Sequence, residues 1–345
     1  MKAVAFRVDA DERIGLGHVM RCLALARALA EKGVKAVFLS RLLPAAVDCR
    51  LRQVGASVVV LPGGTPDEDA LHTLTSARAF NASWICVDHY DLGEQWERTV
   101  AAAGFPLAAI DDYGRSSHAC TLLIDHNVGA QCSHYKTSLR RDTKLLVGPR
   151  YALLRPGFTR RPRTKRESGL RRLQISFGGS DPTGETEKAI EAIALAQLKH
   201  VQVDIIVGAL NPRLAAIRRL AAELPQAVVH VDVERMSDML RATDLVIGAA
   251  GVSLLERCAL AVPSLVVITA ENQQYSAEAA ASLGAISLLG MHTSVNAKDI
   301  ATELERLARS PGALAEMSRA AAQVCDGRGA ARVATEMLLN SEAVR

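Results

Sequence analysis

The chain has 345 residues, of which 49% are hydrophobic and 23% charged, and its formal net charge is +4. These values are typical of a soluble globular protein that is long enough for two domains. No apolar run approaches the length of a membrane span, which excludes insertion into a bilayer. The mild positive charge does not favour nucleic acid as a partner.

The seven cysteines are odd in number and widely spaced, and no CxxC pair occurs. This pattern argues against a zinc ribbon and against a disulfide framework. Buried, reduced thiols are the simpler interpretation, and they indicate a reducing compartment. The first residues run directly into a strand-like pattern rather than a signal peptide. We therefore expect a cytoplasmic protein.

Strand-like and helix-like segments alternate through the first half of the chain. The expected strands are short and almost continuously apolar, as in a sheet covered on both faces; they span residues 3–8, 36–39, 57–61, 84–87, 107–110, 122–124 and 145–147. The expected helices span residues 18–31, 67–80 and 94–103.

The same alternation restarts after a basic segment. Expected strands span 173–177, 203–207, 228–231, 245–247 and 265–268, and expected helices span 186–198, 212–223, 236–242, 253–261, 275–283, 297–309, 313–324 and 330–339. Alternation of this kind predicts an α/β fold with parallel sheets. We expect two Rossmann-like domains facing across a cleft, at residues 1–155 and 172–345, joined by a basic linker at residues 156–171.

A glycine-rich loop after the first strand contains Gly15 and Gly17 and is followed by His18. Met20 stands where a dinucleotide fingerprint has its third glycine, and no acidic residue ends the second strand, so we expect no nicotinamide cofactor. A histidine at a strand–helix junction can exchange protons with a ligand near neutral pH. The alternative is a histidine that only caps or packs locally.

Polar side chains also follow the fourth and fifth strands. Asp88, His89, Tyr90 and Asp91 come after the fourth, and the pair Asp111-Asp112 with Tyr113 comes after the fifth. Ligands of parallel sheets bind at this edge, where titratable side chains gather. Each acid is equally well explained as a turn or helix-cap residue.

Two loops of the second half suit a phosphate group. Residues 178–184 contain Gly178, Gly179, Ser180 and Asp181 and precede a helix, but they lack the lysine of a Walker loop. Glycines permit close backbone approach, and a helix amino terminus favours negative charge. The alternative is an ordinary strand–helix turn.

The second loop, residues 248–251, ends at Gly251. Ser253 is a natural N-cap, and Glu256 stands at capping-box spacing from it. Glu256 is therefore either part of a cap or a carboxylate that accepts two ribose hydroxyls. Asn272 and Gln273, after the next strand, add amides that can reach the same ligand.

Taken in order, these motifs resemble known sugar-nucleotide enzymes of the GT-B group. Residues 248–263 resemble the donor-binding segment of the N-acetylglucosaminyltransferase that completes lipid II. A closer resemblance, from residue 1 to about 283, is to the UDP-sugar hydrolases of pseudaminic acid biosynthesis; it rests on Phe6-Arg7-Val8-Asp9-Ala10, Gly15 to Leu23, Val87-Asp88-His89-Tyr90, Asp111-Asp112, Leu122 to Asn127, Tyr151 to Arg155 and Gly178 to Pro182. Asp125-His126 departs from the family pattern.

The resemblance implies hydrolysis of UDP-2,4-diacetamido-2,4,6-trideoxy-β-L-altropyranose to UDP and the free sugar, in a pathway linked to flagellin glycosylation. Among the implied site residues, the glutamate that matches Glu256 holds the ribose. No metal or cofactor is expected, and the oligomeric state stays open. A glycosyltransferase with a UDP-sugar donor is the main alternative, and a non-catalytic nucleotide-sugar binding protein is a second one.

We assign His18 as the general base, because a histidine near its ordinary pKa suits deprotonation of an attacking water. Direct attack by water predicts inversion at the anomeric carbon. Tyr90 and Asp9 are expected to orient water, sugar or imidazole, and the remaining assigned residues bind substrate; these are Gly17, Arg21, Gly178, Gly179, Ser180, Asp181, Gly251, Ser253, Glu256, Asn272 and Gln273. The roles of His89, of His126 and of the chain after Leu283 stay open.

Overall fold

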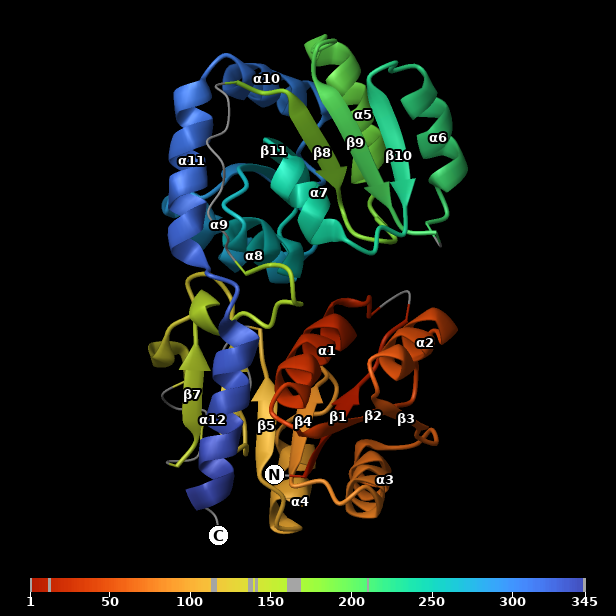
Figure 1. Cartoon of the computed structure of the whole chain (residues 1–345), viewed down its shortest axis with the longest axis vertical. Helices are drawn as coiled ribbons and strands as arrows, with labels where there is room; N and C mark the ends of the chain where they lie inside the picture. Colours follow the sequence, from red (N-terminus) through yellow and green to blue (C-terminus); the bar gives the residue numbers. More distant parts are fainter. Residues whose placement is uncertain are drawn as a thin grey trace. The chain divides into compact units, whose positions relative to one another are not determined.

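The computed structural model describes residues 2–11, 14–112, 117–135, 139, 142–159, 169–209 and 211–343. The chain divides into two compact units, one of Met1–Pro156 with Arg328–Arg345 and one of Gly157–Gly327 (Figure 1). Most of the basic linker predicted at residues 156–171 lies outside the described residues, including Arg160, Arg161, Arg163, Lys165 and Arg166.

The first unit is built on a seven-stranded parallel sheet. Its strands are β1 (Ala3–Val8), β2 (Lys35–Ser40), β3 (Ser57–Val60), β4 (Trp84–Asp88), β5 (Leu107–Ile110), β6 (Leu122–Asp125) and β7 (Lys144–Val147), in the order β3-β2-β1-β4-β5-β6-β7. All seven match strands expected from the sequence. Apolar clusters cover both faces of the sheet, which explains the almost continuously apolar strands.

Helices α1 (Gly17–Ala30), α3 (Pro66–Ala79) and α4 (Glu94–Ala102) lie where the sequence predicts them. The prediction missed α2 (Ala45–Gln53), a short helix in which only Val47 and Leu51 are buried. Two apolar positions four residues apart give a weak periodic signal. Thr65 caps α3 in a capping box with Glu68.

The last helix, α12 (Gly329–Ala343), differs from the domain boundaries expected above. The sequence assigned it to the second domain, but in the structure it is part of the first unit and contacts α1 (Figure 1). The side chains of Val333, Ala334 and Met337 are fully buried in the core of that unit. Burial of this apolar face against the first sheet explains why the chain returns to it.

The second unit holds a six-stranded parallel sheet in the order β10-β9-β8-β11-β12-β13. Its strands are β8 (Arg172–Ser176), β9 (Gln202–Val207), β10 (Ala227–Val231), β11 (Leu245–Ala249), β12 (Ser264–Ile268) and β13 (Ser287–Met291). The first five were predicted, whereas β13 was missed. This edge strand is only partly buried, and Gly290 interrupts its short apolar run, so its sequence does not show a clear strand pattern. Gly290 has a φ of 130°.

The helices of the second unit lie close to their expected positions. They are α5 (Glu185–Ala196), α6 (Leu214–Ala222), α7 (Met236–Ala242), α8 (Val252–Ala259), α9 (Gln274–Ser282), α10 (Ala297–Ala308) and α11 (Pro311–Val324). Among the described residues of both units, no helix is long and apolar enough to cross a membrane.

The two sheets share a topological feature that decides where ligands bind. In each, the chain builds outward from its first strand in one direction and then continues on that strand's other side, so the order reverses between β1 and β4 and between β8 and β11. Open parallel sheets bind ligands outside the carboxyl ends of the strands at such a reversal. A ligand site is therefore expected at the loops after β1, β4, β8 and β11.

Candidate active site

His18 and Asp88 meet at the reversal point of the first sheet. Gly15 has a φ of 79°, which allows the tight turn between β1 and α1, and His18 is the second residue of that helix. Asp88 ends β4, and its Oδ1 lies 2.6 Å from Nδ1 of His18. A carboxylate in this position accepts a hydrogen bond from Nδ1 and leaves the Nε2 lone pair available as a base.

The Asp88 carboxylate is held in its charged form. Burial alone would raise the pKa of Asp88, but the charge of Arg21, followed by that of His18, outweighs burial and holds it well below its usual range. Nε and Nη2 of Arg21 donate hydrogen bonds to the two oxygens of Asp88 at 2.5 and 2.6 Å. An ionised carboxylate beside the imidazole stabilises the imidazolium that forms when Nε2 takes up a proton.

Arg21 also connects His18 to the end of β5. Its Nη1 donates to Oδ1 of Asp112 at 2.6 Å, and its Nη2 donates to Oδ2 at 3.0 Å. The guanidinium is buried and already engaged by two carboxylates. The guanidinium of Arg21 thus already has carboxylate partners in Asp88 and Asp112, whereas the sequence predicts that Arg21 binds substrate; that role stays a prediction.

Tyr90 lies against the imidazole. The edge of one ring meets the face of the other, with the centroids of Tyr90 and His18 4.7 Å apart and the planes at 86°. The Tyr90 hydroxyl donates to Oδ2 of Asp112 at 2.7 Å, while much of the side chain is exposed. This placement brings Tyr90 next to the predicted base, and an exposed ring there can also contact a ligand.

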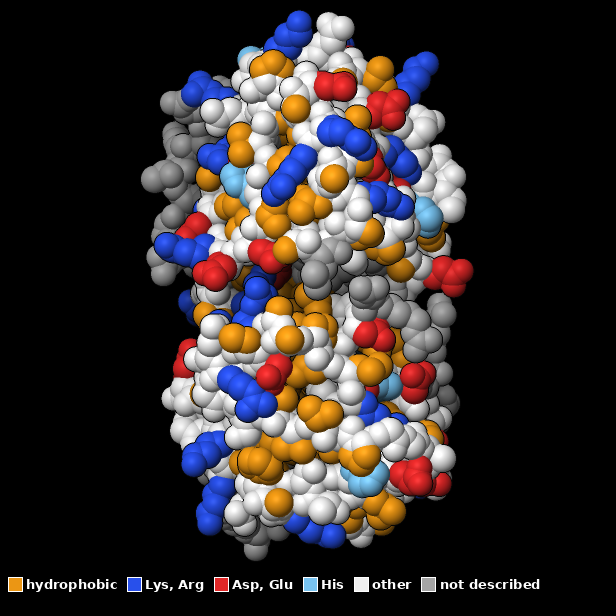
Figure 2. All heavy atoms as spheres, turned by 90° about the vertical axis from the view of Figure 1, so that its right-hand side faces the viewer, with side chains coloured by type: hydrophobic (Ala, Val, Ile, Leu, Met, Phe, Trp, Pro, Cys, Tyr) orange, Lys and Arg blue, Asp and Glu red, His pale blue; other side chains and the backbone are white. Residues whose placement is uncertain are grey.

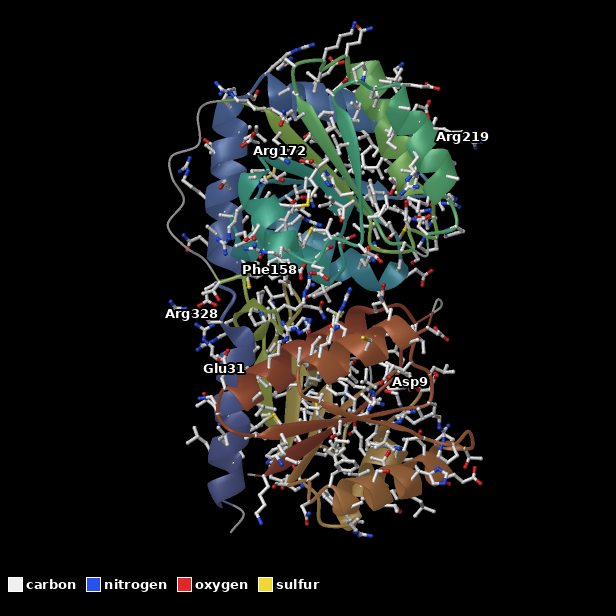
Figure 3. All side chains as sticks on the ribbon, turned by 45° about the vertical axis from the view of Figure 1, so that its right-hand side comes forward. Asp9, Glu31, Phe158, Arg172, Arg219 and Arg328 are labelled. Carbon is white, nitrogen blue, oxygen red and sulfur yellow. The ribbon has the colours of Figure 1, made fainter. Side chains whose placement is uncertain are left out.

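Asp9, the third residue predicted to be catalytic, lies just after β1, where Figure 3 labels it, and belongs to a different network. It accepts hydrogen bonds from Arg7 and from the backbone amide of Arg41, and its Oδ2 lies 3.0 Å from Nε2 of His89. Among the described contacts of Asp9 there is none with His18 or Tyr90. Its carboxylate thus joins the loops that follow β1, β2 and β4, and the carboxylate that orients His18 is Asp88.

Two residues after β6 complete the surroundings of this network. Nδ2 of Asn127 donates to Asp112 at 3.3 Å and to Asp125 at 2.9 Å. His126 is buried, and burial, followed by the charge of Arg21, lowers its pKa to about 4. His126 is therefore uncharged at neutral pH and adds no positive charge near His18. Tyr113 lies outside the described residues.

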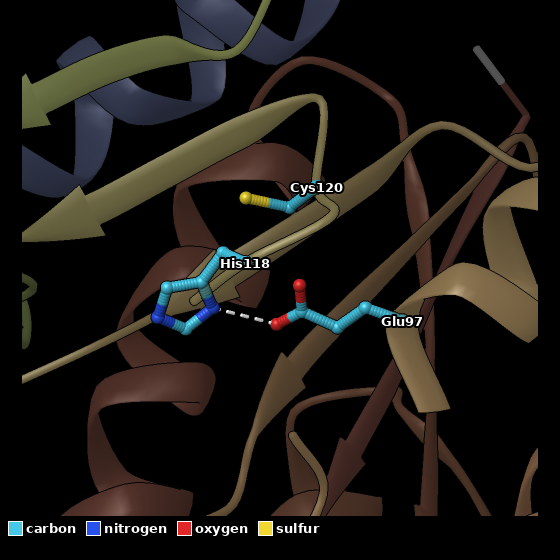
Figure 4. Close-up of side chains that lie close together, drawn as sticks. All are labelled: Glu97, His118 and Cys120. Atoms are coloured by element: carbon cyan, nitrogen blue, oxygen red, sulfur yellow. Dashed lines mark hydrogen bonds and ion pairs between the residues drawn. The ribbon is translucent and has the colours of Figure 1, made fainter. Parts of the chain in front are cut away.

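A second cluster in the first unit holds three potential metal ligands, Glu97, His118 and Cys120 (Figure 4). Nδ1 of His118 lies 2.7 Å from Oε1 of Glu97, a hydrogen-bond distance. Two ligand atoms on one tetrahedral zinc lie about 3.3 Å apart or more. Burial also raises the pKa of the Cys120 thiol well above its usual range, which disfavours the thiolate a metal needs. The contacts fit a buried ion pair rather than a metal centre.

In the second unit, the loop after β8 is closed by its own aspartate. The carboxylate of Asp181 accepts hydrogen bonds from the backbone amides of Glu185 and Thr186 at 3.1 and 2.7 Å. Two of the amides that a phosphate would use at the start of α5 are therefore occupied. Gly178, Gly179 and Ser180 are exposed and remain open to a ligand.

The loop after β11 differs from the capping arrangement expected for Ser253 and Glu256. The N-cap of α8 is Gly251, and no side chain caps this helix. Ser253 is the second helical residue and Glu256 the fifth, so the capping-box prediction is wrong. The N-cap lies two residues earlier than predicted, at Gly251, which ends the loop without a side-chain cap. The cap explanation for the mostly buried Glu256 is thereby removed.

The two amides assigned after β12 have different surroundings. Oε1 of Gln273 accepts hydrogen bonds from the backbone amides of Ala250 and Thr269 at 3.2 and 3.1 Å. It thus holds the loop that leads to α8. Asn272 is exposed on the adjacent short helix, residues Glu271–Gln273, and is accessible to a ligand.

Comparisons with known proteins agree with the resemblance drawn from the motifs. Residues 176–333 match the model of the glycosyltransferase family 28 C-terminal domain. A UDP-2,4-diacetamido-2,4,6-trideoxy-beta-L-altropyranose hydrolase of Campylobacter jejuni is 21% identical over 275 residues, which cover 79% of this chain and 94% of that protein.

Two further relatives match shorter stretches. The spore coat polysaccharide biosynthesis protein SpsG of Bacillus subtilis is 27% identical over 56% of this chain and 57% of its own length. A UDP-N-acetylglucosamine–N-acetylmuramyl-(pentapeptide) pyrophosphoryl-undecaprenol N-acetylglucosamine transferase of Sorangium cellulosum is 34% identical over 60% of this chain and 52% of its own length. The chain thus matches only a little over half the length of these two relatives.

Solved structures establish the fold. MurG of Acinetobacter baumannii superimposes with a TM-score of 0.69 at 15% identity, covering 98% of this chain and 99% of that one. MnaA of S. aureus, solved with UDP, gives a TM-score of 0.67 at 10% identity and covers 99% and 98%. The predicted fold class is confirmed: the chain has the two Rossmann-like domains of the GT-B fold and resembles the UDP-sugar hydrolases that its motifs indicated.

Proposed function

We propose that this protein hydrolyses UDP-2,4-diacetamido-2,4,6-trideoxy-β-L-altropyranose to UDP and the free sugar, within pseudaminic acid biosynthesis in the cytoplasm. The observation that carries the proposal is the His18–Asp88 pair, with 2.6 Å between Nδ1 and Oδ1, at the reversal point of the first sheet. The match to the Campylobacter hydrolase over 94% of that protein supports the choice of substrate.

The reaction requires little beyond a base and an anion site. Nε2 of His18 removes a proton from water as the water oxygen bonds to the anomeric carbon. The bond from that carbon to the diphosphate oxygen breaks, and UDP leaves with the electron pair. The transition state has oxocarbenium character. Because UDP is already a good leaving group, the carboxylic acid that glycosidases use to protonate an alkoxide is unnecessary. Attack from the opposite face inverts the anomeric carbon.

The second unit is assigned to the UDP part of the substrate. Its glycosyltransferase family 28 match covers β11, α8 and β12, and MnaA, one of its structural neighbours, was solved with UDP. Glu256 is proposed to accept the ribose hydroxyls and Asn272 to contact the uridine. The uncapped amino terminus of α8 is suited to a phosphate, since its first amides point outward from the helix.

A glycosyltransferase with a UDP-sugar donor is the second candidate. The 34% identity to the Sorangium transferase, higher than to the hydrolase, favours it. In that reaction His18 would deprotonate an acceptor hydroxyl in place of water. The first steps of substrate binding are the same, so only the acceptor separates the two functions.

Isotope labelling with product analysis decides between them. The purified protein is incubated with the UDP-sugar in ¹⁸O-water without any acceptor. A hydrolase releases UDP and a free sugar that carries one ¹⁸O. Label in UDP would show attack at phosphorus and contradict the mechanism. No turnover until an acceptor is added would favour the transferase. A panel of UDP-sugars, followed by mass spectrometry, then defines the substrate.

A further inference from the structure

Arg257 on α8 is a buried cation without an ion pair among the described residues. Its side chain is about 1% exposed. Nη2 donates to the carbonyl oxygen of Ala249 at 2.6 Å, and Nη1 donates to Oγ of Ser253 at 3.2 Å. Its Nε has no hydrogen-bond partner in the described part of the chain. Buried charges in proteins are normally paired, so this one is unusual.

Burial disfavours the charged form of Arg257. Burial lowers the pKa of the guanidinium to about 10, against a smaller opposing effect of Cys258 and Glu256. It is still charged at neutral pH. Arg21 of the first unit, equally buried, is paired with two carboxylates. Arg257, unlike Arg21, therefore has hydrogen bonds but no carboxylate partner among the described residues.

Arg257 lies directly behind the loop that leads to α8. A Cβ placed on Gly248 would approach Nη1 of Arg257 to 3.2 Å and the carbonyl oxygen of Ser176 to 2.5 Å. Only glycine allows this close packing of loop, guanidinium and β8. Arg257 holds the loop from one side through Ala249, and Gln273 holds it from the other through the amide of Ala250.

The amino terminus of α8 is left open by this arrangement. Its N-cap is Gly251, and no side-chain hydrogen bond caps it. The first amides of a helix have no acceptor within the helix. At α5, the neighbouring helix start of the same unit, the carboxylate of Asp181 fills that position. Of these two helices, only α8 begins without a side-chain cap and has a buried cation, Arg257, in contact with its first turn through Ser253.

We propose that Arg257 is a positioning residue for a phosphate group of the bound nucleotide: it holds residues 248–251 in place and supplies the positive charge of an anion site at the amino terminus of α8. The inference rests on the proposed function, because the ligand is the diphosphate of UDP. Arg257 would act by holding the loop and through the electrostatic potential of its charge, without contacting the phosphate.

The test separates phosphate recognition from recognition of the nucleoside. UDP and uridine are titrated by calorimetry into the wild-type protein, Arg257→Gln and Arg257→Lys. The glutamine variant is expected to bind UDP about 10- to 100-fold more weakly, because a charge within several ångströms of the phosphate is lost in a medium of low dielectric constant. Its affinity for uridine should change less than about 3-fold, and the lysine variant should keep UDP within about 5-fold, since it retains the charge.

Arg219→Gln is the matched control, because it removes the same charge from an exposed position on α6 (Figure 3). Figure 2 shows that several Lys and Arg side chains are exposed on this face, so the loss of one should leave UDP binding within about 2-fold. An equal loss of UDP and uridine in Arg257→Gln would mean that the residue is only structural, and an unchanged UDP affinity would overturn the inference outright.

Two further results keep the inference testable. If Arg257→Gln does not fold, hydrogen–deuterium exchange of the wild-type protein with pyrophosphate takes its place. Protection of the amides of Gly251, Val252 and Ser253 is expected, and its absence overturns the site. Wild-type protein that binds no UDP at all would instead contradict the proposed function, whereas UDP binding that is insensitive to Arg257 contradicts this inference alone.

Discussion

The reversal points of the two sheets share one topology but differ in how their charged side chains are paired. In the first unit, His18, Arg21, Asp88 and Asp112 form a closed network in which each described charge has a partner. In the second unit, the corresponding loop after β11 is made of small residues, no side-chain hydrogen bond caps α8, and the guanidinium of Arg257 has no ion pair among the described residues. A base needs a fixed imidazole of defined tautomer, whereas an anion site needs donors that the protein leaves free.

Removing the imidazole tests the first half of this comparison most severely. His18→Ala should lower kcat by about 10²- to 10⁴-fold, because the general base is lost, and should leave the Kd of UDP within about 2-fold. UDP release and calorimetric UDP binding are the two measurements. His200→Ala, an exposed histidine of the second unit, is the control. Activity close to that of the wild type would make His18 a structural residue.

Replacing the carboxylate tests whether Asp88 acts through His18. Asp88→Asn should lower kcat about 10²-fold, since an amide no longer favours the proton on Nδ1 or stabilises the imidazolium. The variant also leaves Arg21 with one carboxylate, at a cost of about 3 kcal/mol in unfolding free energy. Asp112→Asn has the same effect on Arg21 but does not touch His18. If Asp112→Asn lowered kcat as much as Asp88→Asn does, this would contradict the proposal that Asp88 acts through His18.

The charged interior of the first unit should also make its stability depend on pH. Burial opposes protonation of His118, but Asp111 and Glu97 outweigh it and raise its pKa to about 9. A raised pKa stabilises the folded state fully below about pH 6.5, and this contribution is lost as the pH rises through 9. His118→Gln should therefore remove about 3 kcal/mol of the difference in unfolding free energy between pH 6 and pH 9.5.

Urea unfolding at three pH values measures how the unfolding free energy changes with pH. His200→Gln is the control, and its unfolding free energy should change with pH as in the wild type. An unchanged slope in His118→Gln would show that the Glu97–His118 pair does not titrate as described.

The smallest expected effect concerns the two helix starts of the second unit. Asp181→Ala removes the cap of α5 and should cost about 1 kcal/mol of unfolding free energy. The Kd of UDP should change less than about 3-fold, because the phosphate is proposed to bind at α8. Thr65→Ala, which removes the cap of α3 in the first unit, is a matched control for stability. A loss of UDP affinity above 10-fold in Asp181→Ala alone would move the phosphate to the loop after β8.

Much of the fold could be read from the sequence, and the exceptions have simple causes. Strands β1 and β4 of the first sheet are buried along their whole length, so each stands out as an apolar run. The edge strands β3 and β7 are only partly buried, but their runs of valine and leucine still give a strand pattern. The strand β13 is half-buried at an edge, and α2 buries only two side chains, so neither has a strong pattern. The glycine loop with His18 was found because a strand, a turn and a helix follow one another within a few residues.

The roles of the acids could not be read in the same way. Asp9 and Asp88 both follow apolar strands, and the sequence analysis assigned Asp9. The parallel register of β1 and β4 pairs Val8 with Asp88. In the folded chain the side chain of Asp88 contacts His18. The side chain of Asp9 contacts Arg7 and His89 instead. Likewise, Arg21 was expected to meet substrate, and only the positions of Asp88 and Asp112 show that its charge is already used.

The α/β alternation, the glycine turns and the histidine at the first strand–helix junction can be predicted from the amino-acid sequence alone, because they depend on neighbours a few residues apart. The fold in three dimensions shows which carboxylate lies beside that histidine, that α12 completes the first unit, and that Arg257 is buried with no carboxylate partner among the described residues. These features depend on strand order, register and burial, which join residues 70 or more positions apart, as in the hydrogen bond between His18 and Asp88.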